Sequence, residues 1–214
     1  MLNIGVLVSG SGSNLQAIID AVEAGSLKCA IRVVISNRPS AFAIERAEKH
    51  SIPVEIITRD EFPEREAYDA HLAQRLKKHG VDLVVMAGFM RLITDEMLSA
   101  FPMRIINIHP SLLPAFPGLD VQKKAIEHGV RFSGCTVHFV DAGLDSGPII
   151  IQAVVPVKDT DTTETLSKRI LAEEHRIYPI AIQLYAEGRL QIIGRRVIVA
   201  GAITPEAALK NPLP

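Results

Sequence analysis

Apolar runs and amphipathic segments alternate through the first half of the chain, a pattern typical of βαβ units around a parallel sheet. Residues 83–87 are apolar on both pleat faces, as expected for a central strand covered by helices on two sides. The segment 15–22 places its apolar residues on one helical face. We expect the other strands and helices of this half at the following positions: strands 4–8, 30–35, 53–57 and 104–108, and helices 41–50 and 61–79.

The pattern changes in the second half. Residues 134–140 and 148–157 predict two long strands joined by the turn-forming segment 141–147, and therefore an antiparallel pair added to the parallel sheet. A helix is expected over 162–186, bent at Pro179, followed by a small hairpin at 190–199. The fold class is therefore α/β: a Rossmann-like, mostly parallel twisted sheet with helices on both faces and antiparallel strands added in the C-terminal half.

Composition narrows the class of protein. Hydrophobic residues make up 48% and charged residues 22% of the chain, as in a well-cored globular protein. The formal net charge of −1 argues against a nucleic-acid partner. Cys29 and Cys135 lie far apart, which excludes a disulfide framework and fits a reducing cytoplasm. No apolar run reaches membrane-spanning length, and the N-terminus shows no signal-peptide pattern, so we expect a soluble cytoplasmic protein with no membrane partner.

A glycine-rich turn, residues 9–14, lies between the first strand and the first helix. Such a turn presents backbone N–H groups at a helix N-terminus and forms a cradle for an anion, best a phosphate. Leu15 stands where a dinucleotide fingerprint needs a third glycine, and Asn37-Arg38 stands where it needs an acid. The turn therefore favours a monophosphate. An NADP-like ligand at Arg38 and a simple serine-capped helix remain alternatives.

Asn107 and His109 are two residues apart, so in a β-strand both side chains point to the same face of the sheet. A carboxamide and a protonated imidazole are both hydrogen-bond donors and can hold a developing oxyanion together. Asp145, in the 141–147 turn, would favour the protonated imidazole if this turn folds back to His109. The structural alternatives are an ordinary strand end for the pair and common turn chemistry for Asp145.

Glu174 lies on the apolar stripe of the late helix, which indicates a paired or ligand-binding carboxylate. Salt bridges within 173–176 are the alternative. Arg91 follows the central strand, where ligands bind in such folds, although Arg65 and Arg91 also suit an ordinary surface. His138 is more typical of a sheet histidine than of a catalyst, with a position lining the site as the alternative.

Taken together, these segments resemble the folate-dependent glycinamide ribonucleotide formyltransferase family. The resemblance covers nearly the whole chain and is highly specific when the matching blocks are combined. They occur in the family's order: 9–16, 87–91, 107–114, 144–148 and 174–179. The chain departs from the family at Ser11, where asparagine is expected, and at Leu171, where a polar substrate contact is expected.

The resemblance implies a catalytic trio of Asn107, His109 and Asp145, with Glu174 holding the substrate ribose. It further implies a single domain over 1–214. Its phosphate-binding half would be 1–110, its folate-binding, closing half 111–200, and its C-terminal tail 201–214. The substrate phosphate would lie on Gly12, Ser13 and Asn14. The implied folate-binding residues are Arg65, Met90, Arg91, Leu92, Ile93, Asp141, Ala142, Gly143 and Leu144.

The reaction implied is transfer of the formyl group of 10-formyltetrahydrofolate, a co-substrate, to the amine of 5′-phosphoribosylglycinamide (GAR) in purine biosynthesis. No metal is expected, and the partners would be these two small molecules, with the chain a monomer or homodimer. Hydrolysis of formyltetrahydrofolate and a non-catalytic nucleotide-binding module are the alternatives. Formyltetrahydrofolate deformylase carries an extra N-terminal regulatory domain and needs no phosphate cradle. Methionyl-tRNA formyltransferase adds a C-terminal barrel and a basic surface, and we expect neither of these two features in this chain.

Overall fold

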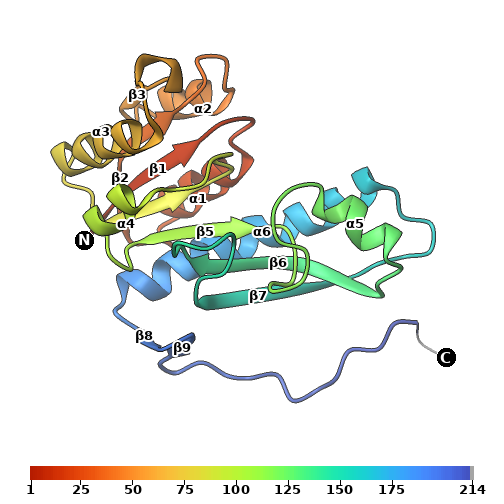
Figure 1. Ribbon diagram of the computed structural model, residues 1–214. Helices are drawn as coiled ribbons and strands as arrows, with labels where there is room; N and C mark the ends of the chain where they lie inside the picture. Colours follow the sequence, from red (N-terminus) through yellow and green to blue (C-terminus); the bar gives the residue numbers. More distant parts are fainter. Residues whose placement is uncertain (213–214) are drawn as a thin grey trace.

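The computed structural model describes residues 1–212, within which nine strands form one sheet in the order β3-β2-β1-β4-β5-β6-β7-β9-β8 (Figure 1). The strands are β1 (Leu2–Val8), β2 (Cys29–Ser36), β3 (Val54–Ile56), β4 (Leu83–Met86), β5 (Ile105–His109), β6 (Phe132–Phe139), β7 (Ile149–Pro156), β8 (Leu190–Ile193) and β9 (Arg196–Val199). The helices are α1 (Ser13–Glu23), α2 (Ala43–Lys49), α3 (Arg65–Lys78), α4 (Asp95–Ala100), α5 (Val121–Glu127) and α6 (Thr163–Ala186), with a 3₁₀ turn η1 at Arg59–Glu61.

Strands β3, β2, β1, β4 and β5 are parallel, as the alternating pattern predicts. One hydrophobic core joins α1, α2, α5 and α6 to the sheet, and a second joins α3 and α4 to its other face. Every residue of β4 is buried, because helices cover both of its faces. Helices on both faces of a mostly parallel sheet are thus confirmed.

The added strands are antiparallel, also as expected. Strand β6 pairs with β5 so that Asn107 lies opposite His138 and His109 opposite Thr136. Strand β7 continues the antiparallel arrangement next to β6, and β8 and β9 form the predicted hairpin. The 141–147 turn joins β6 to β7 and starts beside the strand that carries Asn107 and His109.

One expectation needs correction, and two helices were not predicted. The helix expected from residue 61 begins at Arg65, because Glu64 is extended and η1 ends before it. Thr58 caps η1 through its hydrogen bonds with Glu61. Helices α4 and α5 were not expected, since these short helices bury only one and two residues, against three in α2, and so show little helical period.

The C-terminal region follows α6, which continues through Pro179 as one helix and lies along the sheet beside β6 (Figure 1). Residues 200–210 are exposed, and Asn211 Nδ2 donates to the Val157 carbonyl at 2.9 Å. The last two residues of the expected tail, 213–214, lie outside the described residues. No helix in the part of the chain described is long and apolar enough to cross a membrane.

Candidate active site

Strand β5 presents Asn107 and His109 on one face of the sheet. The intervening Ile108 and the preceding Ile106 belong to the core shared with α6, so the alternate residues leave by the opposite face. His109 is only 5% exposed, and Asn107 is partly buried. Alternation along this short strand is therefore what brings the amide and the imidazole together, as predicted.

The two ring nitrogens of His109 face hydrogen-bond acceptors. Asp145 Oδ2 lies 3.4 Å from Nδ1, and the Phe116 carbonyl oxygen lies 2.9 Å from Nε2. A carboxylate and a carbonyl only accept, so a ring with both nitrogens protonated satisfies both contacts. The structure thus places Asp145 beside His109, with its carboxylate facing Nδ1.

Asp145 is held by two loops. Its backbone has φ 49°, a left-handed conformation that aspartate tolerates better than most residues, and its Oδ2 accepts from the Gly118 N–H at 2.8 Å. Within the 141–147 turn, Asp141 Oδ1 accepts from Ser146 Oγ at 2.6 Å and from Gly143 N at 3.1 Å. The turn is therefore braced internally and tied to the loop that follows β5.

His138 completes the immediate surroundings of Asn107. Its Nδ1 lies 2.8 Å from the Phe139 carbonyl, which can only accept, so Nδ1 carries the proton in the neutral ring. Burial lowers the pKa of His138, which favours that neutral form. Nε2 is then an acceptor, and Asn107 Nδ2 donates to it at 3.3 Å. His138 therefore orients the Asn107 amide, a role that the sequence pattern did not reveal.

A buried polar network supports the loop after His109. Thr136 Oγ1 donates to the Ser111 carbonyl at 2.7 Å and accepts from the Leu113 N–H at 3.1 Å. Gln152 Nε2 donates to the Leu113 carbonyl at 2.9 Å. Residues 111–113 are thus fixed to β6 and β7. Sequence reasoning missed this network, although polar side chains in two otherwise apolar strands are a usable signal.

The glycine-rich turn leads directly into α1. Gly12 has φ +69°, and a Cβ there would lie 2.6 Å from the Ala43 side chain, so both conformation and space require glycine. Among the described residues, no side chain caps the first turn of α1. Its backbone N–H groups, near Ser13 and Asn14, are therefore free to bind an anion.

Glu174 on α6 reaches the same region. Asn14 Nδ2 donates to Glu174 Oε2 at 2.7 Å, and Asn14 Oδ1 is buried with no hydrogen-bond partner in the described part of the chain. Burial raises the pKa of Glu174, an effect that the Asn14 hydrogen bond partly opposes. The Asn14 side chain is thus engaged by Glu174, which leaves its backbone N–H for an anion. Leu171 is half-buried one turn earlier and offers no polar atom.

Four of the expected folate-binding residues, Met90 to Ile93, follow β4, whose Met86 pairs with Asn107. Arg65, Arg91 and Leu92 line a cavity of about 450 Å³ together with Arg59, which sequence reasoning missed. Met90 and Leu144 are 63% and 50% exposed, so apolar contact surface remains available. Ile93 instead packs against the α3 core. The remaining expected residues, Asp141, Ala142 and Gly143, lie on the partly exposed turn before Asp145.

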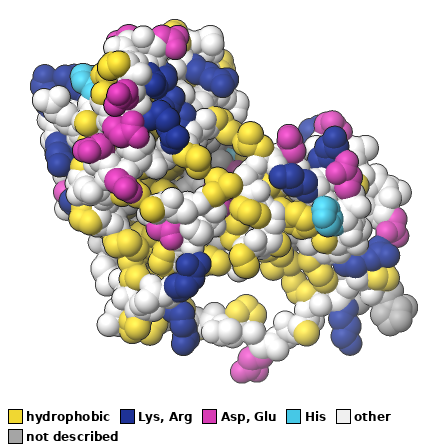
Figure 2. Space-filling view, viewed as in Figure 1, with side chains coloured by type: hydrophobic (Ala, Val, Ile, Leu, Met, Phe, Trp, Pro, Cys, Tyr) yellow, Lys and Arg dark blue, Asp and Glu magenta, His cyan; other side chains and the backbone are white. Residues whose placement is uncertain are grey.

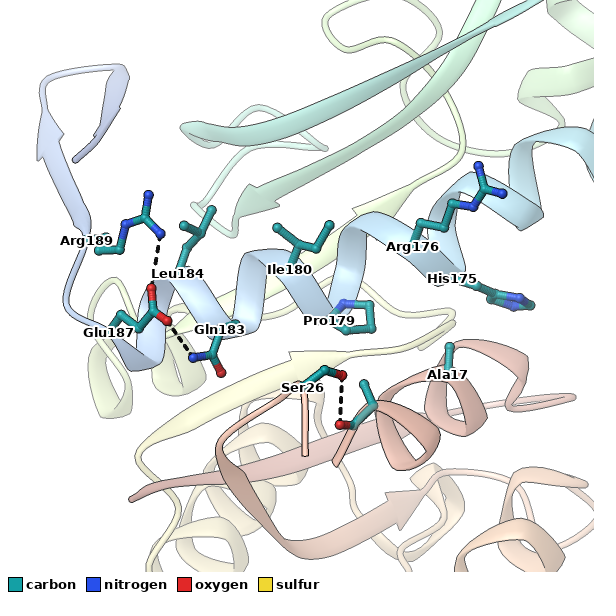
Figure 3. A pocket seen from close by; sticks show the side chains of 11 residues that line it. Ala17, Ser26, His175, Arg176, Pro179, Ile180, Gln183, Leu184, Glu187 and Arg189 are labelled. Carbon is teal, nitrogen blue, oxygen red and sulfur yellow. Dashed lines mark hydrogen bonds and ion pairs between the residues drawn. The ribbon is translucent and has the colours of Figure 1, made fainter. Parts of the chain in front are cut away.

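A different hollow of about 330 Å³ lies between α1 and α6 (Figure 3). Its wall includes Ala17, Ser26, Pro179 and Ile180, and it holds none of the predicted site residues. Within residues 1–212, no group of three His, Cys, Asp or Glu side chains could hold a metal ion. The chemistry-bearing residues therefore gather at the ends of β1, β4 and β5 rather than in this hollow.

Comparison with known proteins decides the family. The model of the formyl transferase family matches residues 2–182. The chain belongs to the formyl transferase family. This formyl transferase is 44% identical to phosphoribosylglycinamide formyltransferase of Escherichia coli strain K12 over 191 residues, which covers 89% of the chain and 90% of that protein. It is 48% identical to the trifunctional purine biosynthetic protein adenosine-3 of Drosophila pseudoobscura pseudoobscura over 190 residues.

The latter match covers 88% of this formyl transferase but only 14% of the trifunctional relative. Among solved structures, glycinamide ribonucleotide transformylase 1 of Symbiobacterium toebii superposes with a TM-score of 0.92 at 59% identity, covering 93% and 94% of the two chains. A formyltetrahydrofolate deformylase from Pseudomonas syringae pv. tomato DC3000 superposes with a TM-score of 0.86 at 27% identity. That match covers 92% of this formyl transferase and 65% of the deformylase.

Proposed function

We propose that this chain transfers the formyl group of 10-formyltetrahydrofolate to the amine of GAR, giving formyl-GAR and tetrahydrofolate in de novo purine biosynthesis. The observation that carries the proposal is the position of Asp145 3.4 Å from His109, on the face that also presents Asn107. High similarity to named GAR formyltransferases over most of the chain supports the choice of substrates. We place the reaction in the cytoplasm, with the chain acting as a monomer or homodimer.

Asn107 and His109 stabilise the negative charge that develops on the formyl oxygen. One N–H of the Asn107 amide is used by His138, which leaves the second N–H for that oxygen. The Nε2–H of His109 is held by the Phe116 carbonyl. Donating to the formyl oxygen through Nε2 means exchanging one acceptor for another, which costs little when both bonds are well formed.

Asp145 sustains the charge on the His109 ring through the contact at Nδ1. With an ordered water, it helps to move a proton from the attacking amine to the departing folate nitrogen. The Gly118 N–H holds one of its oxygens in place, so the carboxylate is preorganised for this role.

GAR is positioned by residues at the start of α1 and on α6. Gly12, Ser13 and Asn14 bind its phosphate through backbone N–H groups at the start of α1, and Glu174 accepts from the ribose hydroxyls. Ser9 Oγ accepts from the Met90 N–H at 3.0 Å, which ties the phosphate-binding turn to the folate-binding segment.

The residues around the arginine-lined cavity fit a folate. The guanidinium carbon of Arg91 lies 4.5 Å from the centre of the Tyr68 ring, and its Nε is buried without a partner among residues 1–212. This guanidinium therefore still has donors for an acid. Exposed Met90 and Leu144 supply apolar contacts for the ring systems. The folate supplies the formyl carbon, and these residues would hold its acidic and apolar parts.

One assay tests the proposal. Purified protein is mixed with 10-formyltetrahydrofolate, with and without GAR, and the release of tetrahydrofolate is followed. Release that depends on GAR supports the transferase. Release without GAR supports the hydrolase, the reaction named for the similar deformylase structure. Absence of release with both substrates present would contradict both enzymes and favour the binding module.

A further inference from the structure

We infer that Arg59, together with Arg65 and Arg91, forms a carboxylate-binding extension of the folate site that recognises a second, γ-linked glutamate. The inference rests on the proposed function and deepens it, because it names the form of co-substrate that this chain prefers. A folate with one glutamate carries two carboxylates, and each further γ-linked glutamate adds one. Three guanidinium groups around one cavity therefore match a tail of at least two glutamates.

The three arginines come from separate parts of the fold. Arg59 begins η1, Arg65 begins α3, and Arg91 follows β4, yet all three line the same cavity of about 450 Å³. Figure 2 shows Lys and Arg side chains gathered over the part of the molecule around β3 and α3, next to a hollow lined by hydrophobic side chains. The three arginines do not share one helix face, and the fold brings their guanidinium groups to one cavity whose lining includes no acid.

None of these guanidinium groups is neutralised within residues 1–212, since no carboxylate lies within 4.0 Å of any of them. Arg59 donates to the Phe62 and Pro63 carbonyls, and Arg65 Nη2 donates to the Leu92 carbonyl at 3.2 Å. Four acids flank Arg59 and Arg65 in the sequence: Asp60, Glu61, Glu64 and Glu66. None of the four forms an ion pair within residues 1–212, and Glu61 is engaged by Thr58, with 2.6 Å between Oε1 and Oγ1.

Each guanidinium has five N–H donors, so contacts to a few carbonyls leave others for an anion. The carbonyl contacts hold Arg59 in place and reduce the loss of side-chain entropy when it binds a ligand. Arg59 is also half-buried, which strengthens its interaction with an acid compared with a fully exposed cation. Arg59 is thus a preorganised cation beside the two arginines expected from the family resemblance.

A structural role is the competing explanation. Arg59 could serve only to hold the turn before α3 through the Phe62 and Pro63 carbonyls. In that case its loss would disturb all folates equally, because Arg65 would move with the turn. A tail-binding role affects only folates that have the second glutamate, so tail length separates the two explanations.

The test measures KM and kcat for 10-formyltetrahydrofolate with one, two and three glutamates in the wild type, Arg59→Gln and Arg59→Lys. The control is Arg32→Gln, which removes the same charge near the other end of α3, where Arg32 contacts the His79 carbonyl. We expect the wild-type KM to fall about three- to tenfold from one glutamate to two, in the range of one charge-assisted contact. Arg59→Gln abolishes this fall, Arg59→Lys retains part of it, and Arg32→Gln retains all of it.

Two outcomes would overturn the inference: a wild-type KM that does not depend on tail length, or an Arg59→Gln variant that keeps the dependence. An equal loss for every tail length, not relieved by lysine, would assign Arg59 to the structural role. Direct binding of tetrahydrofolate with one or two glutamates, measured by calorimetry, repeats the comparison without turnover. A chain that shows the binding preference but no GAR-dependent release would contradict the proposed reaction and leave the tail site supported.

Discussion

Asp145 Oδ2 lies 3.4 Å from His109 Nδ1 and, on the same oxygen, accepts from the Gly118 N–H at 2.8 Å. One carboxylate oxygen thus connects the turn after β6 with the loop after β5. Asp145 Oδ1 lies 3.9 Å from His138 Nε2, so the other oxygen faces the histidine that orients Asn107. The trio therefore behaves as one connected unit, and changes to its members should not be additive.

Asp145→Asn should lower GAR-dependent turnover about 10²–10³-fold, the scale for loss of a key electrostatic group in acyl transfer. The amide preserves shape and can still accept from Gly118, but it carries no charge to sustain the His109 imidazolium. Steady-state kinetics should show the loss in kcat, with KM for GAR changed only a few-fold. The matched control is Asp159→Asn, an exposed carboxylate paired with Arg131, which should keep normal turnover. Normal kcat in Asp145→Asn would contradict the assigned role.

His138→Phe should lower kcat by about tenfold while KM for both substrates changes little, because the Asn107 amide loses the acceptor that orients it. His138→Gln offers an amide oxygen in place of Nε2 and should recover part of kcat. The pH profile adds a second readout. Burial lowers the pKa of His138, so its Nε2 stays an acceptor through neutral pH and activity should not decline with its titration there. Equal losses in the two variants would indicate a packing role only.

Hydrophobic periodicity predicted the layered fold well, because long buried strands and amphipathic helices carry their own signal. The same periodicity did not predict the short elements, which consist of only a few residues. Helices α4 and α5 bury only one and two residues, too few to show a period. The helix expected from residue 61 left η1, and the turn that positions Arg59, unpredicted.

The features of the site also divide into those that local sequence predicts and those that depend on the tertiary structure. The pair Asn107 and His109 follows from alternation along one strand, and the glycine-rich turn from its local chemistry. The role of His138 depends on the cross-strand register that sets it opposite Asn107, and the reach of Asp145 depends on the folding back of a whole turn. Neither relationship is local in sequence, so neither is encoded in a pattern that one strand or helix displays.

Glu174→Gln should alter how stability depends on pH. Burial raises the folded-state pKa of Glu174 above its usual value of 4.5, so the protonated carboxyl is favoured in the folded protein. Its contribution to stability is fully present below that usual value and is lost as pH rises through the folded pKa. The difference in Tm between wild type and Glu174→Gln should therefore favour the wild type most in acid and shrink as pH rises above the usual pKa of 4.5. Thermal unfolding over this range measures it. A difference in Tm that does not change with pH would show that Glu174 titrates normally.

Gly12→Ala should damage both the fold and the phosphate site. The residue has φ +69°, and an added Cβ would lie 2.6 Å from the Ala43 side chain, so we expect a loss of about 1–3 kcal/mol in the free energy of unfolding. Displacing the start of α1 would also raise KM for GAR, since the first-turn N–H groups would no longer converge on the phosphate. Gly10→Ala is the matched control in the same turn, because its Cβ would meet nothing within 4 Å and its φ is not positive. Denaturant unfolding and steady-state kinetics on both variants give the comparison. If Gly10→Ala and Gly12→Ala behaved alike, the backbone conformation at Gly12 would not be what positions the cradle.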